Sequence, residues 1–480
     1  MKTALVWIQR EFRIDYLPAL QRALDESEKV IVAYFHDEDY TQGEAGSVWL
    51  AHALEALQNT FYRRNGCAGL WVMEGRFEPN LLKLFSEYHV QTVYYSFQVG
   101  HPFNEMQQKA QRVCESYGVA LHPSFSEFWF EPGEILNKKG EPYAVFTPFY
   151  RNVLTKIDSL EPFEKTRMGR HKILPPPESW EQAASLVQLS RQPWAQELMK
   201  HWSVGEQSGW QQLFAFIDGA FAEYDVQRDL PARDSTSHLS AYLNFGHVSS
   251  RMLIFELKSL GDQVGAQQIQ SWLRQLAWRE FARLLLWFFP YTEEMPFQSR
   301  FIDFSWDGVD QRTHIWQRGQ TGIPIVDAGM RQLWHSGYMH NRVRMVVASF
   351  LTKNLNQHWL VGKRWFDDTL LDADPANNVM GWQWVAGCGV DAAPYYRLFN
   401  PVRQSQKFDP DGEYIRQWVP ELARLDSAVI HAPWENSTAC RACGIELGRD
   451  YPFPLVDLEQ SRLQHLQRVE ALKSVRVEAF

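Results

Sequence analysis

Apolar and polar positions follow two different periods along this chain, and the change between them predicts two kinds of domain. In the first 125 residues, short apolar runs alternate with segments whose apolar positions recur at helical spacing. The predicted strands are TALVWI, KVIVAYF, GLWVMEG, VQTVYYS and VALHPS. Strands that alternate with helices form parallel sheets, so this part predicts an α/β domain with a doubly wound, Rossmann-like parallel sheet.

The strand pattern nearly disappears after about residue 200. Segments such as GWQQLFAFIDGAFAEY and RMLIFELKSL place apolar residues on one helix face, which predicts an almost entirely helical domain. The stretch that precedes them is polar and bears several prolines, as is typical of a connector. We therefore expect an α/β domain over residues 1–125, a connector over 126–200 and a helical domain over 201–480.

Composition narrows the class of protein. No run of about 18 apolar residues occurs and the N-terminus is charged, so a soluble, cytoplasmic protein without a membrane anchor is expected. Five cysteines do not form a disulfide framework, and Cys440 and Cys443 supply only half of a metal site, so no metal is expected. No Gly-x-Gly-x-x-Gly follows the first strand, which places a dinucleotide elsewhere than in the α/β domain.

The charge balance bears on nucleic-acid binding. A net charge of −9 argues against indiscriminate binding of polyanions. A local basic patch is still compatible with this charge, because Arg342, Arg344, Arg397, Arg403 and Lys407 lie close in sequence to the distinctive aromatic segment described below. The chain also contains 20 tryptophans, which suit a packed helical core, a surface for stacking bases or a redox relay.

The most distinctive segment runs from Asp372 to Pro401 and reads DADPANNVMGWQWVAGCGVDAAPYYRLFNP. It combines the adjacent amides of Asn377 and Asn378 with two tryptophans and many small residues. Small residues let planar groups approach the backbone closely, and amides hydrogen-bond to ring heteroatoms. The composition therefore favours a site for a planar cofactor.

This segment resembles the FAD-binding signature of the DNA photolyase and cryptochrome family nearly position for position. The resemblance covers essentially the whole chain and is strongest to the class I cyclobutane pyrimidine dimer (CPD) photolyases. It implies a deoxyribodipyrimidine photo-lyase, a carbon-carbon lyase in which light-excited, reduced FAD donates an electron to a flipped-out dimer in UV-damaged DNA. A monomer without an obligate protein partner is expected.

The resemblance assigns flavin contacts to four regions. The hydroxyl cluster that follows Tyr224 would grip the diphosphate, although such a cluster alone more often caps a helix. We expect Arg344 to pair with Asp372 beside the flavin. The predicted flavin-binding residues are Tyr224, Ser235, Thr236, Ser237, His238, Leu239, Ser240, Trp272, Arg279, Asn341, Arg344, Asp372, Ala373, Asp374 and Asn378.

The same resemblance assigns contacts to damaged DNA. Four cations, Arg228, Arg342, Arg397 and Lys407, would contact the phosphates, and Trp278 and Trp384 would hold the lesion. The predicted substrate contacts also include Gln275, Asn341 and Met345.

Gln275 departs from the family pattern. The CPD enzymes commonly have glutamate here, and an amide donates hydrogen bonds but cannot deliver a proton. Repair of (6-4) photoproducts or of single-stranded DNA therefore stays an alternative.

Electron transfer is implied for three tryptophans and one amide. Trp306, Trp359 and Trp382 match the family's electron-transfer chain, with Trp382 next to the flavin and Trp306 at the surface. Asn378 matches the residue that faces flavin N5, where an amide can hydrogen-bond to the reduced ring and an acid can protonate it. Asparagine favours a repair enzyme over the alternative, a cryptochrome photoreceptor.

Two N-terminal motifs are weaker matches. The opening VWIQREFRIDYLPAL resembles that of the family, with its Asp-Asn changed to Tyr16-Leu17. Asn104 and Glu105 resemble the pair that binds a reduced folate, 5,10-methenyltetrahydrofolate, as an antenna in some relatives. In the connector, GEPYAVFTPFYRN resembles a motif in which an extended segment leads to an arginine.

Overall fold

The computed structural model describes the chain over residues 2–40, 43–168, 172–177, 183–261, 265–392 and 397–474. Positions 393–396 of the predicted cofactor segment lie outside this range.

The chain divides into two compact units, and each is assembled from separate stretches of sequence. The first unit consists of Met1–Ala222, Ser237–Pro290 and Leu371–Ala376. The second unit consists of Glu223–Thr236, Tyr291–Leu370 and Asn377–Phe480.

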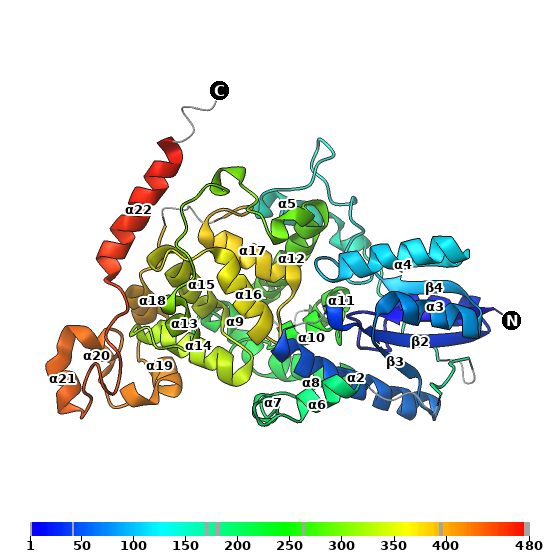
Figure 1. The fold of residues 1–480 in the computed structure, drawn as a ribbon, viewed down its shortest axis with the longest axis horizontal. Helices are drawn as coiled ribbons and strands as arrows, with labels where there is room; N and C mark the ends of the chain where they lie inside the picture. The colour runs from blue at the N-terminus through cyan, green and yellow to red at the C-terminus, as the bar shows by residue number, and fades with distance from the viewer. Residues whose placement is uncertain are drawn as a thin grey trace. The chain divides into compact units, whose positions relative to one another are not determined.

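The first unit contains a five-stranded parallel sheet in the order β3-β2-β1-β4-β5 (Figure 1). Its strands are β1 (Thr3–Ile8), β2 (Lys29–His36), β3 (Leu70–Glu74), β4 (Val90–Ser96) and β5 (Ala120–Ser124). The central strand pairs on both sides, with Leu5 opposite Ile31 of β2 and Val93 of β4. The predicted doubly wound sheet is confirmed, because each apolar run forms a strand.

Helices cover both faces of this sheet, as parallel sheets require. On one face, Trp7 and Tyr95 belong to a core shared with α3 (Phe77–Tyr88) and α4 (Phe103–Tyr117). The alternate positions of β1 point to the opposite face and are equally buried, with Ala4 and Val6 both at 0% exposure. The central strand is therefore covered on both faces, whereas the edge strand β5 is partly exposed.

The remaining helices of the first unit include the long helix α12. They are α1 (Pro18–Glu26), α2 (Glu44–Asn65), α5 (Phe146–Lys156), α6 (Ala184–Ser190), α7 (Pro193–Met199), α8 (Glu206–Asp218), α10 (Ser240–Asn244), α11 (Ser250–Leu260) and α12 (Ala266–Phe288).

Helix α5 corrects the expectation of an extended connector motif. The chain is extended at Val145 and becomes helical at Phe146, so the TPF part is helical. Pro148 lies in the first turn, where a missing backbone N–H costs no intrahelical hydrogen bond.

The second unit is helical, as predicted. Among its described residues, strand pairing is limited to isolated bridges such as Asp307 with Gln357. Its helices are α9 (Tyr224–Gln227), α13 (Gln311–Gln317), α14 (Pro324–Ser336), α15 (Asn341–Ser349), the π-helix η7 (Phe350–Asn354), α16 (Trp359–Thr369), α18 (Pro401–Phe408), α19 (Glu413–Trp418), α20 (Ser427–Ile430), α21 (Ser437–Ala442) and α22 (Leu458–Ser474). Helix α17 (Pro375–Ala386) begins in the first unit and continues in the second.

Short 3-10 turns complete the structure at η1 (Glu38–Tyr40), η2 (Ile157–Ser159), η3 (Ala220–Glu223), η5 (Pro290–Glu293), η6 (Ser299–Phe301), η8 (Pro420–Leu422) and η9 (Pro433–Asn436). Within the described ranges, none of the helices has the length and apolar character needed to cross a membrane.

Candidate active site

Asn378, on α17, is buried and fixed by α16. Its Nδ2 donates to the carbonyl oxygen of Lys363 at 3.0 Å and to Oδ1 of Asp367 at 2.6 Å. Lys363 and Asp367 also form an ion pair at 3.0 Å. Both protons of the amide nitrogen are therefore used within the protein, and Oδ1 is the atom that Asn378 presents as an acceptor.

Trp382 lies one turn further along α17 and is 2% exposed. Its ring packs edge-on against Phe366, with centroids 5.0 Å apart, and lies 6.3 Å from the ring of Trp316. Helix α16 approaches this ring at Gly362, where a Cβ atom would come within 2.0 Å of the indole. Gly362 thus leaves the space that Trp382 fills.

Trp359 and Trp306 are connected by a histidine that the sequence comparison did not select. The His358 ring lies 5.3 Å from the ring of Trp306 and 5.6 Å from that of Trp359. Its Nδ1 accepts the N–H of Leu360 and so caps α16. Trp359 is buried and Trp306 is half-buried, so Trp306 is the more accessible end of this series.

Arg279, on α12 of the first unit, has an unused donor in a buried position. Its NH2 group donates to the carbonyl oxygen of Leu243 at 3.1 Å, whereas NH1 is buried and has no hydrogen-bond partner among the described residues. Burial, and then the charge of Arg283, lowers the pKa of Arg279. A buried guanidinium with a free N–H fits the binding of an anionic or carbonyl-bearing cofactor.

Asp374 is held by Arg283, a residue that sequence comparison missed. The two side chains form a buried ion pair at 3.2 Å, and Arg283 also donates to Oε1 of Gln98 at 3.1 Å. Arg283 follows Arg279 by four residues, so both point from the same face of α12. That spacing is the signal in the sequence by which a second buried cation could have been found.

Asn244, on α10, is another missed residue that fixes the segment Leu371–Ala376. Its Nδ2 donates to the carbonyl oxygen of Leu371 at 3.1 Å, and its Oδ1 accepts from Arg10 at 2.7 Å. Burial lowers the pKa of Arg10 to about 10. Nothing in the local pattern around Asn244 indicated this role, because its partners are distant in sequence.

In the hydroxyl cluster, Ser235, Thr236 and Ser237 contact other groups of the protein, and Ser240 begins a helix. Ser235 Oγ donates to the carbonyl oxygen of Gln227, and Thr236 Oγ1 lies 3.4 Å from the hydroxyl of Tyr338. Ser237 Oγ accepts the N–H of Leu239 at 3.4 Å. Ser240 begins α10, and the nearby His238 has a positive φ of 50°.

Tyr224 begins the short helix α9 and is 6% exposed. Burial raises the pKa of its hydroxyl to about 12, so the hydroxyl remains protonated at neutral pH and can donate a hydrogen bond. The guanidinium of Arg228 lies 5.6 Å from the Tyr224 ring.

The aromatic residues of α12 have aromatic neighbours of their own. Trp278 stacks on Phe146 with centroids 3.5 Å apart and planes 7° apart, and it is only partly exposed. Trp272 is 3% exposed and packs against Phe216 and Phe221. Gln275 lies between these two tryptophans in sequence and is half-buried.

Two of the four predicted phosphate contacts, Arg342 and Lys407, lie against one aromatic ring. The guanidinium of Arg342 lies 4.3 Å from the Phe408 ring, and Lys407 Nζ lies 5.0 Å from the same ring. Arg342 also forms an ion pair with Asp229 at 2.6 Å and donates to Met345 Sδ at 3.8 Å. The structure thus brings Arg342, Met345 and Lys407 together, with the charge of Arg342 partly balanced by Asp229.

The other predicted residues of the second unit occupy helix ends or segments between helices. Arg344 Nε donates to the carbonyl oxygen of Met339 at 2.7 Å, and its pairing with Asp372 stays a prediction. Asn341 is exposed at the start of α15, Trp384 is half-buried on α17, and Arg397 is exposed.

The predicted folate pair lies at the start of α4. The carboxylate of Glu105 lies 3.6 Å from Nδ1 of His101, and the backbone N–H of Asn104 donates to the carbonyl oxygen of Gly100.

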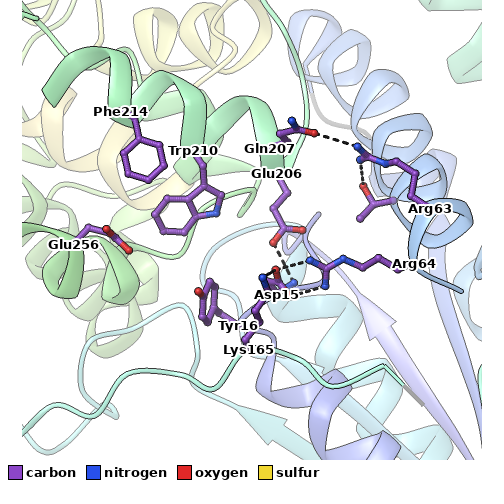
Figure 2. Close-up of a pocket in the computed structure, with 11 residues that line it drawn as sticks. Asp15, Tyr16, Arg63, Arg64, Lys165, Glu206, Gln207, Trp210, Phe214 and Glu256 are labelled. Atoms are coloured by element: carbon purple, nitrogen blue, oxygen red, sulfur yellow. Dashed lines mark hydrogen bonds and ion pairs between the residues drawn. The ribbon is translucent and has the colours of Figure 1, made fainter. Parts of the chain in front are cut away.

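A separate pocket of about 430 Å³ lies in the first unit, and its charged groups mostly satisfy one another (Figure 2). Arg64 binds both carboxylate oxygens of Asp15 at 2.5 Å, and Lys165 lies 3.5 Å from the same carboxylate. Glu206 accepts the backbone N–H groups of Ile14 and Asp15. This arrangement fixes the loop after β1 to α2 and α8, and its lining includes none of the predicted flavin or DNA residues.

Comparisons with known proteins identify the family. Residues 4–168 match the family described as DNA photolyase, and residues 272–471 match the FAD binding domain of DNA photolyase. A deoxyribodipyrimidine photo-lyase of Agrobacterium fabrum is 37% identical over 98% of this chain and 99% of its own length. Cryptochrome-1 of Arabidopsis thaliana is 30% identical over 99% of this chain and 72% of its own length.

Solved structures agree with this result. A bacterial class III photolyase from Agrobacterium tumefaciens has a TM-score of 0.91 and 36% identity, covering 99% of this chain and 98% of that one. A cryptochrome from Synechocystis has a TM-score of 0.86 and 27% identity, covering 97% of this chain and 99% of that one.

The chain therefore belongs to the DNA photolyase and cryptochrome family. It is an enzyme of the photolyase type, and its cofactor is FAD. The match to a class III structure leaves the predicted class I membership a prediction.

Proposed function

We propose that this protein is a monomeric, light-driven DNA repair enzyme that splits cyclobutane pyrimidine dimers in UV-damaged DNA. The observation that carries the proposal is the environment of Asn378. Its amide nitrogen is bound to Lys363 and Asp367, so the side chain offers an acceptor oxygen and no acidic proton. An acceptor at this position suits a flavin ring that carries a hydrogen on N5, which is the reduced form that repair requires.

Polar side chains of the predicted flavin regions would hold FAD. Arg279 offers its unused buried NH1 group, and Tyr224 offers a hydroxyl that stays protonated. Ser237, which precedes α10, and Ser240, which begins it, would contact the diphosphate, and Asp374, which forms a buried ion pair with Arg283, would make a further contact to FAD. When bound and reduced, FAD supplies the electron that opens the dimer.

Trp306, Trp359 and Trp382 would supply electrons to the site from outside. The ring of His358 contacts those of Trp306 and Trp359, which supports their proximity. Trp382 is 2% exposed and so is protected from solvent, as a buried electron donor needs to be.

DNA would be bound by cations and by aromatic surfaces with different tasks. Arg228, Arg342, Arg397 and Lys407 contact phosphates in this proposal and position the strand. Trp278 and Trp384, both half-buried, present ring surface to the extruded lesion, and Gln275 donates to its carbonyl groups. Asn341 and Met345 lie on one side of α15 and complete the lesion contacts.

A folate antenna is the less strongly supported part of the proposal. It rests on Asn104 and Glu105, which follow each other at the partly exposed start of α4. The absorption spectrum of the purified protein tests it, because a methenyl folate adds an absorption band to those of FAD.

The central test is repair under blue light. Photoreduced protein is mixed with duplex DNA that contains a single CPD, and intact thymine is measured against a sample kept in the dark. We expect thymine to be recovered only in the light. If thymine is recovered from a (6-4) duplex or from damaged single-stranded DNA but not from the CPD duplex, that DNA takes the place of the CPD duplex as the substrate. Absence of recovery from all three would leave the cryptochrome alternative.

A further inference from the structure

Lys353, in the π-helix η7, is buried although it carries an ammonium group. Its side chain is 1% exposed, and Nζ donates to the carbonyl oxygen of Arg397 at 2.6 Å. Arg397 is exposed and precedes α18 by four residues. A lysine from the interior of the second unit thus holds the backbone of a residue whose side chain faces solvent.

A second contact, from the helix that directly precedes η7, holds the same segment. Ser349, at the end of α15, is fully buried, and its Oγ accepts the backbone N–H of Phe399 at 3.2 Å. Two side chains four residues apart therefore bind the chain on both sides of Leu398. Asn400 then caps α18 by accepting the N–H of Arg403, so the segment is fixed from Arg397 to the helix start.

The π-helix provides the geometry for these contacts. The N–H of Leu355 donates to the carbonyl oxygen of Phe350 at 2.9 Å, which is the i to i+5 pattern. Such a turn accommodates an extra residue and rotates the side chains around it relative to a regular α-helix. Single π turns occur frequently at functional sites.

The hydrogen bond from Lys353 to the Arg397 carbonyl oxygen is not explained by stability alone, because burying the ammonium group costs free energy. A buried ammonium group loses solvation that one carbonyl oxygen replaces only in part, and no carboxylate pairs with Lys353 among the described residues. Burial, opposed by the nearby Cys388 thiol, lowers the pKa of Lys353 to about 7. An apolar side chain of similar length would fill this space without that loss.

We infer that Lys353 is a positioning residue, which together with Ser349 fixes the Arg397–Phe399 backbone so that the Arg397 guanidinium meets a DNA phosphate. This inference rests on the proposed function, because it requires that Arg397 contact DNA. Lys353 itself touches neither the lesion nor the flavin in this arrangement, and it acts through Arg397.

The inference is tested by a double-mutant cycle on the full-length, FAD-loaded protein. The variants are Lys353→Met, Arg397→Ala and both together, and binding to a CPD duplex is measured at several salt concentrations. We expect each single variant to weaken binding severalfold and to reduce the slope of log K against log salt by about one. In the Arg397→Ala background, Lys353→Met should cause no further change, because its effect passes through Arg397.

Two further measurements separate positioning from general destabilisation. Lys353→Met should raise KM for CPD repair and leave kcat and flavin photoreduction unchanged. Tyr451→Phe is the matched control, since it removes a buried hydrogen bond to Asp327 elsewhere in the same unit and should leave DNA binding intact. If Lys353→Met does not fold, Ser349→Ala removes the second contact with a smaller change and should give the same pattern.

The outcomes are distinguishable. Additive losses in the double variant, or an unchanged affinity in Lys353→Met beside a weakened Arg397→Ala, would overturn the inference and leave the proposed function standing. An unchanged affinity in Arg397→Ala would remove Arg397 from the proposed DNA contacts and the inference with it.

Discussion

Individual side chains at the candidate site are fixed by contacts that leave one defined atom or face for a ligand. Asn378 uses its nitrogen internally and presents its oxygen, and Arg279 uses NH2 internally and keeps NH1. The specificity of each residue therefore depends on its partner as much as on its own chemistry.

Replacing Asn378 by aspartate tests that dependence. In Asn378→Asp, a carboxylate would replace the donor that now lies 2.6 Å from Asp367, and the two acids would repel each other. We expect a loss of about 1–3 kcal/mol in the free energy of unfolding at pH 7.5. The pKa of the new acid is raised by the repulsion, so stability should recover as the pH falls toward 5.

Urea unfolding at both pH values checks this result. Asn378→Ser, which removes the amide without adding charge, serves as the control and should show little additional pH dependence. Equal losses for the aspartate and serine variants at pH 7.5 would contradict the role given to Asp367.

Gly362 permits a second prediction, because it leaves room for Trp382. An alanine normally stabilises a helix relative to glycine, but a Cβ at Gly362 would overlap three atoms of the indole. We expect Gly362→Ala to cost about 1–3 kcal/mol of stability and to slow photoreduction, because the displaced ring is a proposed electron donor.

The control for this variant is Gly381→Ala on α17, where a new Cβ meets open space. It should be neutral or slightly stabilising in the same thermal unfolding measurement. A stable Gly362→Ala protein with normal photoreduction would mean that Trp382 can move without loss.

Sequence comparison identified these residues better than it identified their partners. Asn378 and Trp382 belong to a distinctive segment, whereas Asp367, Lys363 and His358 lie on another helix in an ordinary amphipathic pattern. A partner of this kind is defined by tertiary contact, and one sequence alone carries no sign of it.

Among helices and strands, the apolar period was the most informative signal. The strands β1, β2 and β4 follow apolar runs directly, because a strand buried on both faces tolerates few polar residues, whereas the edge strand β5 is only partly buried. The π-helix η7 was not predicted, since one extra residue in a turn leaves the apolar pattern nearly unchanged. Helix α5 was expected to be extended because the motif that it resembles is extended, and the helix tolerates Pro148 because this residue lies in the first turn.

Elements of the first unit are also joined by a buried histidine, which makes stability depend on pH. His247 Nε2 accepts from Trp49 on α2 at 3.0 Å, and Nδ1 lies 3.0 Å from the carbonyl oxygen of Phe12. Burial lowers the pKa of His247 from 6.5 to about 4. As the pH falls, the unfolded chain therefore binds a proton before the folded protein does.

The contribution of His247 to stability should be complete above pH 6.5 and decrease by about 3 kcal/mol as the pH falls to 4. Burial raises the pKa of Glu280 to about 7, which gives an opposite trend in the same range. The effect is therefore read from urea unfolding of the natural protein and of His247→Gln at pH 7.5, 6 and 5. The variant should be less stable at pH 7.5 and lose less stability on acidification; parallel curves would exclude His247 as the cause.

At the scale of the whole molecule, the protein is acidic, so the proposed binding of DNA depends on a small number of cations. The net charge is −9, and one of the four proposed phosphate contacts, Arg342, is already paired with Asp229. Asp229→Asn would release that arginine. We expect tighter binding to a CPD duplex and a slope of log K against log salt that is steeper by about 0.9.

The control changes the total charge equally at a pair that the proposal does not use. Glu413→Gln disrupts the more distant and exposed pair with Arg233, in which the charged atoms are 3.7 Å apart. Its salt slope should remain that of the natural protein. Identical effects in both variants would show that total charge, and not Arg342, determines the binding.

The division of the chain into two discontinuous units has a consequence for biosynthesis. The first unit needs residues up to Ala376, while the second already includes Glu223–Thr236. Chains are made from the N-terminus at about 5–20 residues per second, and contiguous domains commonly fold as they emerge. Here the first unit must wait for more than three-quarters of the polypeptide before its last segment, Leu371–Ala376, is made, although all five strands of its sheet are complete by Ser124. Its unfinished surface is therefore exposed to chaperones and proteases throughout most of translation.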